Sequence, residues 1–277
     1  MRKLLSANFS RLRRDKMFWI CLAAVLLLSV VSTLEEFREV FLPYGDDSCI
    51  LDDSYYLIAP LIFLFIVIFT SLFMRAEYSD GMVRNKIIVG HSRRGIYLAN
   101  FTVCFSASLA FTAAWSIGVL IGIPIFSTNK LDLNCLAKYI LIAVFLAAAL
   151  TGIMVLISTV STNKSLTAVG GILIFFVLLI FAIWVYNFLS EPEIICDMCM
   201  TADGTIEMSN PESNLLYISG LERTVYEWIL YILPMGQWLI MANHEIFHPI
   251  RQLVGSSLVT FCTTFCGILT FRRKNLK

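Results

Sequence analysis

Six long apolar runs, separated by polar stretches, dominate the chain. They cover residues 17–31, 55–73, 96–126, 139–160, 166–189 and 253–271. A helix of roughly 20 apolar residues spans the hydrocarbon core of a bilayer, and a shorter run can do so when its polar ends snorkel to the interface. The pattern therefore predicts an all-α polytopic membrane protein with six transmembrane helices.

The charges between these runs divide into two groups. Four stretches hold 16 of the 21 Lys and Arg but only 3 of the 20 Asp and Glu: 1–16, 74–95, 161–165 and 272–277. The other 5 basic and 17 acidic residues lie in three stretches: 32–54, 127–138 and 189–252. Because basic loops stay in the cytoplasm, this division predicts that both termini are cytoplasmic.

Composition supports the membrane assignment. The chain is 58% hydrophobic with a mean hydropathy of +0.78, more apolar than the surface of a soluble domain of this size permits. Its net charge of +1 gives no indication of nucleic-acid binding. The first run follows basic residues but lacks a small-residue cleavage site, so we expect it to be a retained span and not a signal peptide.

Residues 1–16 alternate basic and apolar side chains at helical spacing. Leu4, Leu5, Phe9 and Leu12 would lie opposite the Arg and Lys side chains. This pattern predicts an interfacial helix on the inner leaflet. The alternative is a disordered basic leader that only orients the first span.

The cytosolic loop 75–94 is too long and too regularly patterned to be a simple connector. A short helix over 77–86, parallel to the membrane, would suit docking into a groove of another protein through its polar side chains: Glu77, Asp80, Arg84 and Lys86. Gly81 and Gly90 would permit turns or close approach. The alternative is a solvated loop whose only role is its positive charge.

The outer loop 189–252 contains an apolar segment, 226–247, that Pro234 and Gly236 interrupt. These two residues argue against a single helix that crosses the membrane. It predicts a re-entrant hairpin of two short helices in the outer leaflet, with Trp228 and Trp238 at the interface. The alternative is one amphipathic helix on the outer surface.

Residues 244–248 match the zinc-peptidase pattern H-E-x-x-H. His244 and His248 would bind zinc from one helix face, and Glu245 would act as general base on the metal-bound water. No acidic residue or further His follows His248 to serve as a third ligand, and Pro249 would end the helix there. A membrane zinc peptidase therefore remains only an alternative function.

Three cysteines, Cys49, Cys196 and Cys199, fall in outer loops. An oxidising compartment allows a disulfide among them, although the sequence does not define its pairing.

The apolar runs carry no Asp, Glu, Lys or Arg near their middles, where ion-coupled carriers usually keep an ionisable group. The sequence also lacks a phosphate-binding G-x-x-x-x-G-K-[ST] loop. If this chain transports a substrate, we expect a separate polypeptide to bind the ATP.

Loop 75–94 resembles the coupling-helix region of permeases of type-2 ABC (ABC-2) transporters. The matching positions precede a new apolar run: Glu77, Gly81, Arg84, Asn85, Lys86, Gly90, Ser92 and Arg93. The resemblance extends to the basic leader, the six runs and the long outer loop. Pro234, Gly236 and Gln237 also resemble the Pro-x-Gly-Gln stretch of that family, whose re-entrant pair caps the outer end of the substrate path.

The resemblance implies one permease domain over residues 1–277 and a non-enzymatic role in a bacterial plasma membrane. Two copies of a cytosolic ATPase would hold ATP and Mg, while this chain itself would bind no cofactor. A second permease subunit, identical or homologous, would complete the exporter within membrane lipid. The cargo would be amphipathic or hydrophobic, such as a peptide, an antimicrobial or a lipid-like molecule. A non-transporting membrane scaffold or sensor, which would have no ATPase partner, is a further alternative.

Overall fold

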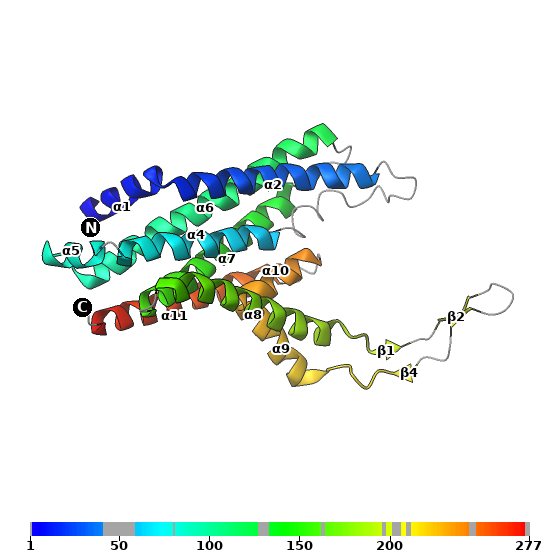
Figure 1. Ribbon diagram of the computed structural model, residues 1–277. Coiled ribbons are helices and arrows are strands. Elements are labelled where there is room, and N and C mark those ends of the chain that lie inside the picture. The colour runs from blue at the N-terminus through cyan, green and yellow to red at the C-terminus, as the bar shows by residue number, and fades with distance from the viewer. Residues whose placement is uncertain are drawn as a thin grey trace.

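The protein is a bundle of long helices with a small stranded arm (Figure 1). A computed structural model describes residues 2–40, 59–79, 81–126, 133–161, 164–195, 198–200, 206–208, 212–243 and 248–274. Its helices are α1 (Arg2–Arg14), α2 (Lys16–Val40), α4 (Ala59–Ser79), α5 (Met82–Ile88), α6 (Arg93–Phe126), α7 (Leu133–Val160), α8 (Lys164–Ser190), α9 (Gly220–Ile232), α10 (Pro234–Ala242) and α11 (Pro249–Arg273). Its strands are β1 (Ile194–Ile195), β2 (Met198–Met200), β3 (Ile206–Met208) and β4 (Glu212–Ser213).

The predicted helical membrane architecture is confirmed. Among the described residues, α4, α6, α7, α8 and α11 are each long and apolar enough to cross a membrane. The pair α1 and α2, bent by 62° where they meet, gives a sixth candidate span. The basic leader is helical, as predicted, and α1 turns Leu4 and Leu12 into the bundle.

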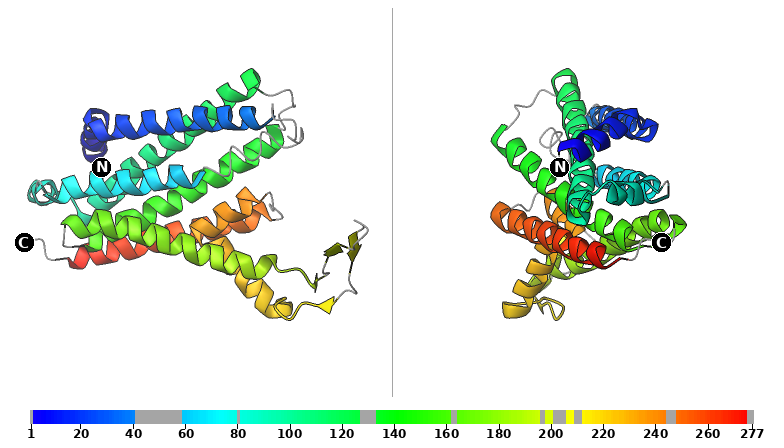
Figure 2. Two further views of the ribbon diagram at one scale, coloured as in Figure 1. Left: turned by 45° about the vertical axis from the view of Figure 1, so that its right-hand side comes forward. Right: turned by 90° about the vertical axis from the view of Figure 1, so that its left-hand side faces the viewer.

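Both termini lie at the same end of the bundle as α5 (Figures 1 and 2). The stranded arm projects from the opposite end. The even number of crossings predicted from the sequence requires the two termini to share a side, and this arrangement agrees with that requirement.

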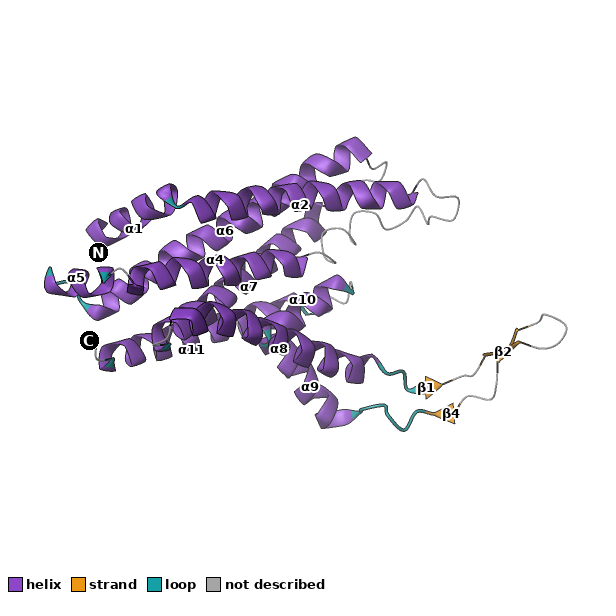
Figure 3. Ribbon diagram, in the orientation of Figure 1, coloured by secondary structure: helices purple, strands orange, loops and turns teal. Residues whose placement is uncertain are grey.

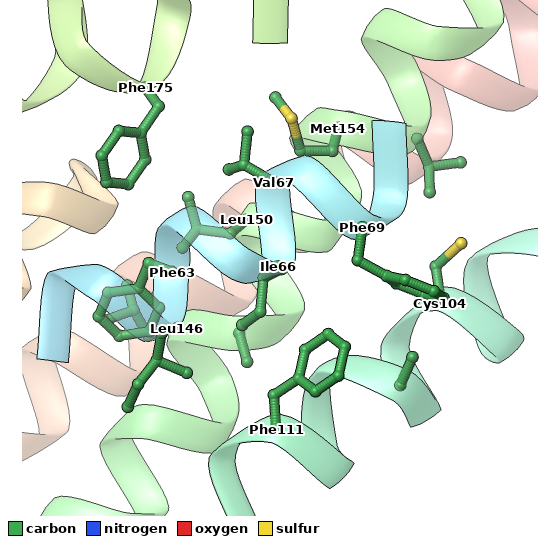
Figure 4. Close-up of a cluster of buried hydrophobic side chains, with 14 of the residues drawn as sticks. Phe63, Ile66, Val67, Phe69, Cys104, Phe111, Leu146, Leu150, Met154 and Phe175 are labelled. Atoms are coloured by element: carbon green, nitrogen blue, oxygen red, sulfur yellow. The ribbon is translucent and has the colours of Figure 1, made fainter. Parts of the chain in front are cut away.

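Helix α4 lies at the centre of the bundle and packs against α6, α7 and α8. Figure 4 shows its buried side chains meeting those of the three neighbours: Phe63, Ile66, Val67 and Phe69 of α4, Cys104 and Phe111 of α6, Leu146, Leu150 and Met154 of α7, and Phe175 of α8. Helix α2 covers α6, and α11 runs along α7. Because van der Waals packing, and not exclusion from water, holds helices together in lipid, this interdigitation stabilises the bundle.

The segment between α8 and α9 contains strands, whereas the sequence pattern indicated only a loop there. Two short antiparallel ladders form an arm between α8 and α9 (Figure 3). In one ladder Ile194 pairs with Ser213, and in the other Met198 pairs with Met208. Strands of two or three residues carry too little alternation to be recognised in a sequence.

The predicted pair of short helices is present as α9 and α10. They are separated at Leu233, whose extended backbone (φ −73°, ψ 123°) interrupts the helix, and Pro234 then opens α10. Pro at a first helical position loses no hydrogen bond, because that N–H has no partner within the helix. Helix α9 begins at Gly220, six residues before the predicted start at residue 226. The prediction missed its first turns because they are amphipathic and not uniformly apolar.

Candidate functional site

The carboxylate of Glu77 lies at the centre of a buried polar cluster, at the end of the bundle that carries the termini. Its side chain is fully shielded from solvent. Oε1 accepts hydrogen bonds from Nζ of Lys86 at 2.8 Å and Nδ2 of Asn100 at 2.9 Å, and Oε2 lies 3.3 Å from Nη1 of Arg11. A buried charge is tolerated when it is both paired and hydrogen-bonded, and here both conditions are met.

Asn8 completes this group, which we call the Glu77 cluster. Its Nδ2 donates to Oδ1 of Asn100 at 2.8 Å, and its Oδ1 accepts from Nζ of Lys86 at 2.7 Å. The five side chains come from four helices, since Asn8 and Arg11 lie on α1, Glu77 on α4, Lys86 on α5 and Asn100 on α6. The cluster therefore ties α5 to three other helices at once.

Arg11 is held on α4 by a second set of contacts. Its Nη2 donates to the carbonyl oxygen of Phe73 at 2.6 Å, and its guanidinium carbon lies 4.2 Å from the centre of the Phe73 ring. Glu77 stands in the last turn of α4, where the helix dipole disfavours an anion. The cations of Arg11 and Lys86 offset this cost, which explains how α4 continues to Ser79, past the predicted end at residue 73.

Helix α5 is flanked by two glycines, each at a backbone conformation that favours glycine. Gly81 at its start has φ +66° and Gly90 after its end has φ +93°. The N–H of Gly90 donates to the carbonyl of Ile87, and the N–H of His91 donates to that of Lys86, which is a Schellman motif. The positive φ values, and not crowding, favour glycine, because added Cβ atoms would meet nothing within 4 Å.

The two faces of α5 differ in chemistry. Val83 is buried and Lys86 points into the Glu77 cluster, whereas Arg84 and Asn85 are exposed. Ile88 and Val89, at the end of the helix, are 72% and 76% exposed. Two apolar side chains this accessible are typical of a surface that another protein or a membrane covers.

The structure divides the docking face that the sequence suggested. Arg84 and Asn85 lie outward as a docking role requires, but Glu77 and Lys86 pair inside the bundle. Asp80 lies outside the described residues. Glu77 and Lys86 therefore hold α5 in place from within and are not available to a partner.

Arg93, which the resemblance placed with the coupling residues, binds the end of α11. Its Nη1 donates to the carbonyl oxygens of Phe271 at 3.2 Å, Arg272 at 3.1 Å and Lys274 at 2.6 Å. The last carbonyls of a helix have no partner within it, and a cation satisfies both their hydrogen bonding and the helix dipole. Arg93 thus joins the start of α6 to the end of α11.

Lys274 extends this connection to α7. Its Nζ donates to the carbonyl oxygens of Thr159 at 2.6 Å and Ser161 at 3.1 Å, and it lies 5.3 Å from the centre of the Tyr78 ring. Burial lowers the pKa of the Lys274 ammonium from its ordinary value. Together with the Glu77 cluster, these contacts cross-link the helix ends on this side of the bundle.

Replacing Arg93 with alanine should lower the free energy of unfolding by about 1.5 kcal/mol, the lower end for hydrogen bonds to a charged group, because Arg93 is partly exposed. Thermal unfolding of the detergent-purified protein measures this loss. Arg94→Ala is the matched control, since Arg94 is its exposed neighbour. Equal unfolding midpoints for the two variants would contradict a capping role.

The residues predicted for the outer gate are all buried where α9, α10 and α11 meet. Nε2 of Gln237 donates to the carbonyl oxygens of Tyr231 at 2.5 Å and Gln252 at 3.1 Å, while its Oε1 accepts from Oγ of Ser256 at 2.7 Å. A Cβ on Gly236 would lie 2.6 Å from the carbonyl oxygen of Leu230. Gln237 therefore fastens the hairpin to α11.

The other candidates lie mostly outside the described part of the chain. This holds for Cys49, Cys196, His244 and Glu245, and only the backbone of Cys199 is described, in β2. His248 is exposed and precedes α11. Within the described ranges, no three His, Cys, Asp or Glu side chains are grouped to hold a metal. The disulfide and the zinc site remain predictions.

Three members of the Glu77 cluster were not found by sequence reasoning: Asn8, Arg11 and Asn100. Asn8 carried a usable signal, because it shares the buried face of α1 with Leu4 and Leu12. A polar residue on the apolar face of an amphipathic helix usually has a partner. Asn100, near the start of an apolar run, is the same kind of signal.

Comparison with known proteins places these features in a family. Residues 4–186 match the family described as ABC-2 family transporter protein. The match covers more than half of the 277 residues and includes the whole Glu77 cluster and Arg93. It ends before α9, so the outer hairpin and α11 lie beyond it. No curated protein sequence matches the chain.

Proposed function

The chain belongs to the ABC-2 family of transporter membrane proteins, and from this premise we propose that it is the permease subunit of an ATP-driven exporter. It is a multi-pass transport subunit without an ATPase domain of its own. The observation that supports an ATP-driven exporter best is α5, whose inner face is bound to the bundle while its outer face is exposed. A helix so arranged can receive a force from a partner and pass it to the transmembrane helices.

The end that carries α5 and the termini would face the cytoplasm of a bacterial cell. The charge distribution supports this orientation, since 16 of the 21 Lys and Arg belong to stretches that the span order assigns to this side. The stranded arm and the hairpin of α9 and α10 would then lie on the outer side.

Two ATPase subunits would each dock on the α5 helix of one permease subunit. One permease subunit is this chain, and the other is a second copy of it or a homologue. Arg84, Ile88 and Val89 would supply the docking surface. An open groove of about 430 Å³ lies beside α5 and gives a partner further relief to fit. Its lining combines charged side chains of α1 with apolar surface: Ala7, Ser10, Arg11, Arg14, Asp15 and Met82.

ATP-driven closure of the two ATPases would displace α5, and the Glu77 cluster would carry this displacement into α1, α4 and α6. Buried ion pairs with fixed geometry resist deformation more than exposed ones do, so the helix ends would move together. The result would be a rigid-body rotation of the bundle, one of the common forms of domain motion. The hairpin, with Pro234, Gly236 and Gln237, would open the outer end of the path.

The exposed face of α11 supports the proposed substrate class. Only 17% of α11 is buried within the chain. Its exposed face mixes the rings of Phe261 and Phe265 with the hydroxyls of Ser257 and Thr270. If this face lines a path between two permease subunits, it suits an amphipathic peptide or lipid-like molecule better than a sugar or an ion.

The docking surface can be tested with two single substitutions, Arg84→Glu and Ile88→Asp. Each should abolish recovery of a stoichiometric ATPase when the tagged chain is purified from its host in mild detergent, because each places a negative charge in the contact. Mass spectrometry identifies and quantifies the bound partner. Arg94→Glu is the control, since it reverses an exposed cation at the same end of the bundle.

Recovery of the ATPase with the unmodified chain and with Arg94→Glu, but not with the two α5 variants, is the expected result. An unmodified chain that purifies without any ATPase would overturn the exporter assignment. ATPase recovery that is equal for all variants would leave the assignment standing but move the docking surface away from α5.

A further inference from the structure

A pocket of about 310 Å³ lies between α8, α9 and α10, at the end of the bundle opposite α5. It is lined by both polar and apolar side chains: Tyr186, Leu189, Ser190, Arg223, Glu227, Leu230, Tyr231 and Ile240. None of the gating or coupling residues described above is among them. We propose that this pocket binds the phosphate headgroup of a phospholipid and that Arg223 is its principal ligand.

Arg223 has an incomplete set of partners. Its Nε lies 3.6 Å from Oε1 of Glu227, and its guanidinium carbon lies 5.4 Å from the centre of the Tyr217 ring. Its Nη1 is buried and has no hydrogen-bond acceptor. A buried charged donor without an acceptor is costly, so this atom indicates a missing anionic partner. One edge of the guanidinium is therefore engaged by Glu227, and the other lacks an acceptor.

The charge of the surroundings favours a singly charged anion. Glu227 is shared, because its Oε2 lies 3.6 Å from Nη1 of Arg251. The trio of Arg223, Glu227 and Arg251 thus carries one net positive charge, which a single phosphodiester would balance. Arginine is well suited to phosphate, since its planar N–H groups match the spacing of the phosphate oxygens.

The position of the pocket favours a lipid over a free phosphate. On α9, the residues facing away from the pocket form an exposed apolar stripe at helical spacing: Leu221, Val225, Trp228 and Ile232. On α8, which also borders the pocket, Trp184 packs edge-on against Phe188 at 4.8 Å, and Phe188 stacks with Tyr226 of α9. Aromatic side chains concentrate where a bilayer meets water, so the pocket would lie at headgroup depth.

Helix α8 offers a surface for the acyl chains. Only 22% of its apolar span is buried. Phe176 and Ile183 precede the pocket residue Ser190 at intervals of seven residues, so they share its side of the helix, and they are 45% and 40% exposed. A phospholipid whose phosphate reached Arg223 could extend its acyl chains along this face. The bound lipid would fill the space between α8 and the hairpin, and so would stabilise the position of the hairpin. This inference rests on insertion in a membrane and does not require the exporter function.

The test is lipid binding to the purified chain, measured by native mass spectrometry as phosphatidylglycerol is titrated into a neutral detergent. Arg223→Gln should weaken the tightest binding event about tenfold, because the amide cannot form the charged contact. Arg223→Lys keeps the charge but loses the planar geometry. Its affinity for phosphatidylglycerol should lie between those of the unmodified chain and Arg223→Gln. Lys138→Gln is the control, since Lys138 is an exposed cation near the same end of the bundle.

Two further probes identify the source of the phosphate and keep the test valid if Arg223→Gln fails to fold. Diacylglycerol has the acyl chains without phosphate, and glycerol phosphate has the phosphate without chains; both should bind the unmodified chain at least tenfold more weakly. Equal binding of diacylglycerol, equal binding of glycerol phosphate, or unchanged binding of folded Arg223→Gln would each overturn the proposal. Arg223→Gln should still recover the ATPase, so failure here is distinguishable from failure of the exporter assignment.

Discussion

Replacing Glu77 with alanine should destabilise the protein more than any other single substitution at the α5 end, by about 3–5 kcal/mol. This is the usual cost of removing one partner from a buried ion pair, because the remaining charge is left without compensation. Two cations lose their counter-charge, as Lys86 and Arg11 are only 16% and 21% exposed. The thermal unfolding midpoint of the detergent-purified protein measures the effect, and ATPase recovery should be lost with it.

The origin of this loss can be separated from a simple packing defect. Glu77→Gln keeps the shape but not the charge, and should be less damaging than Glu77→Ala. Adding Lys86→Met to Glu77→Ala removes one of the uncompensated cations and should restore part of the stability, which a double-mutant cycle quantifies. Glu222→Ala, at an exposed carboxylate, is the control. A wild-type midpoint for Glu77→Ala would refute the central role of this carboxylate.

Replacing Gly255 with alanine should displace the outer hairpin from α11 and cost about 3 kcal/mol, the upper end for overpacking a tight contact. A Cβ at this position would overlap the carbonyl oxygen of Tyr231 and would lie 3.3 Å from Nε2 of Gln237. That carbonyl accepts a hydrogen bond from Gln237. Since the obstructing atom belongs to the backbone, no side-chain rotation can relieve the clash.

Limited proteolysis in detergent, with cleavage sites mapped by mass spectrometry, should show faster cutting near α9 and α10 in this variant. Gly170→Ala is the matched control, because it also adds a methyl group to an apolar helix but meets nothing within 4 Å. Both substitutions raise helix propensity equally, so only the clash distinguishes them. Equal cleavage rates in the two variants would show that the close contact at Gly255 does not hold the hairpin.

The helices and their order could be predicted from the sequence because each membrane span requires a long apolar run. The faces of those helices could not. Runs as uniformly apolar as those of α7 and α8 have no polar stripe to mark the interior of the bundle, so nothing distinguishes buried Leu146 from exposed Val177 before packing is known. Small residues and rare polar ones carry the packing information, as Gly255 and Asn100 illustrate.

The candidate site shows a similar limit. The sequence singled out loop 75–94, but it treated Glu77, Arg84 and Lys86 as one polar face. The turn at Gly81 reverses the chain between α4 and α5, so that Lys86 comes back onto Glu77 while Arg84 stays outside. A chain reversal of this kind depends on a single positive φ angle, which periodicity cannot reveal. The role of these residues in coupling to an ATPase remains a prediction.

The Glu77 cluster also has a consequence for biosynthesis. All five of its side chains lie between residues 8 and 100, so the α5 end of the bundle can be assembled soon after α6 leaves the ribosome. The hairpin is fastened by Gln237 to α11, which follows it in the chain. Because chains fold from the N-terminus during synthesis, the α5 end of the bundle would form first, and the opposite end would close only after α11 has been made.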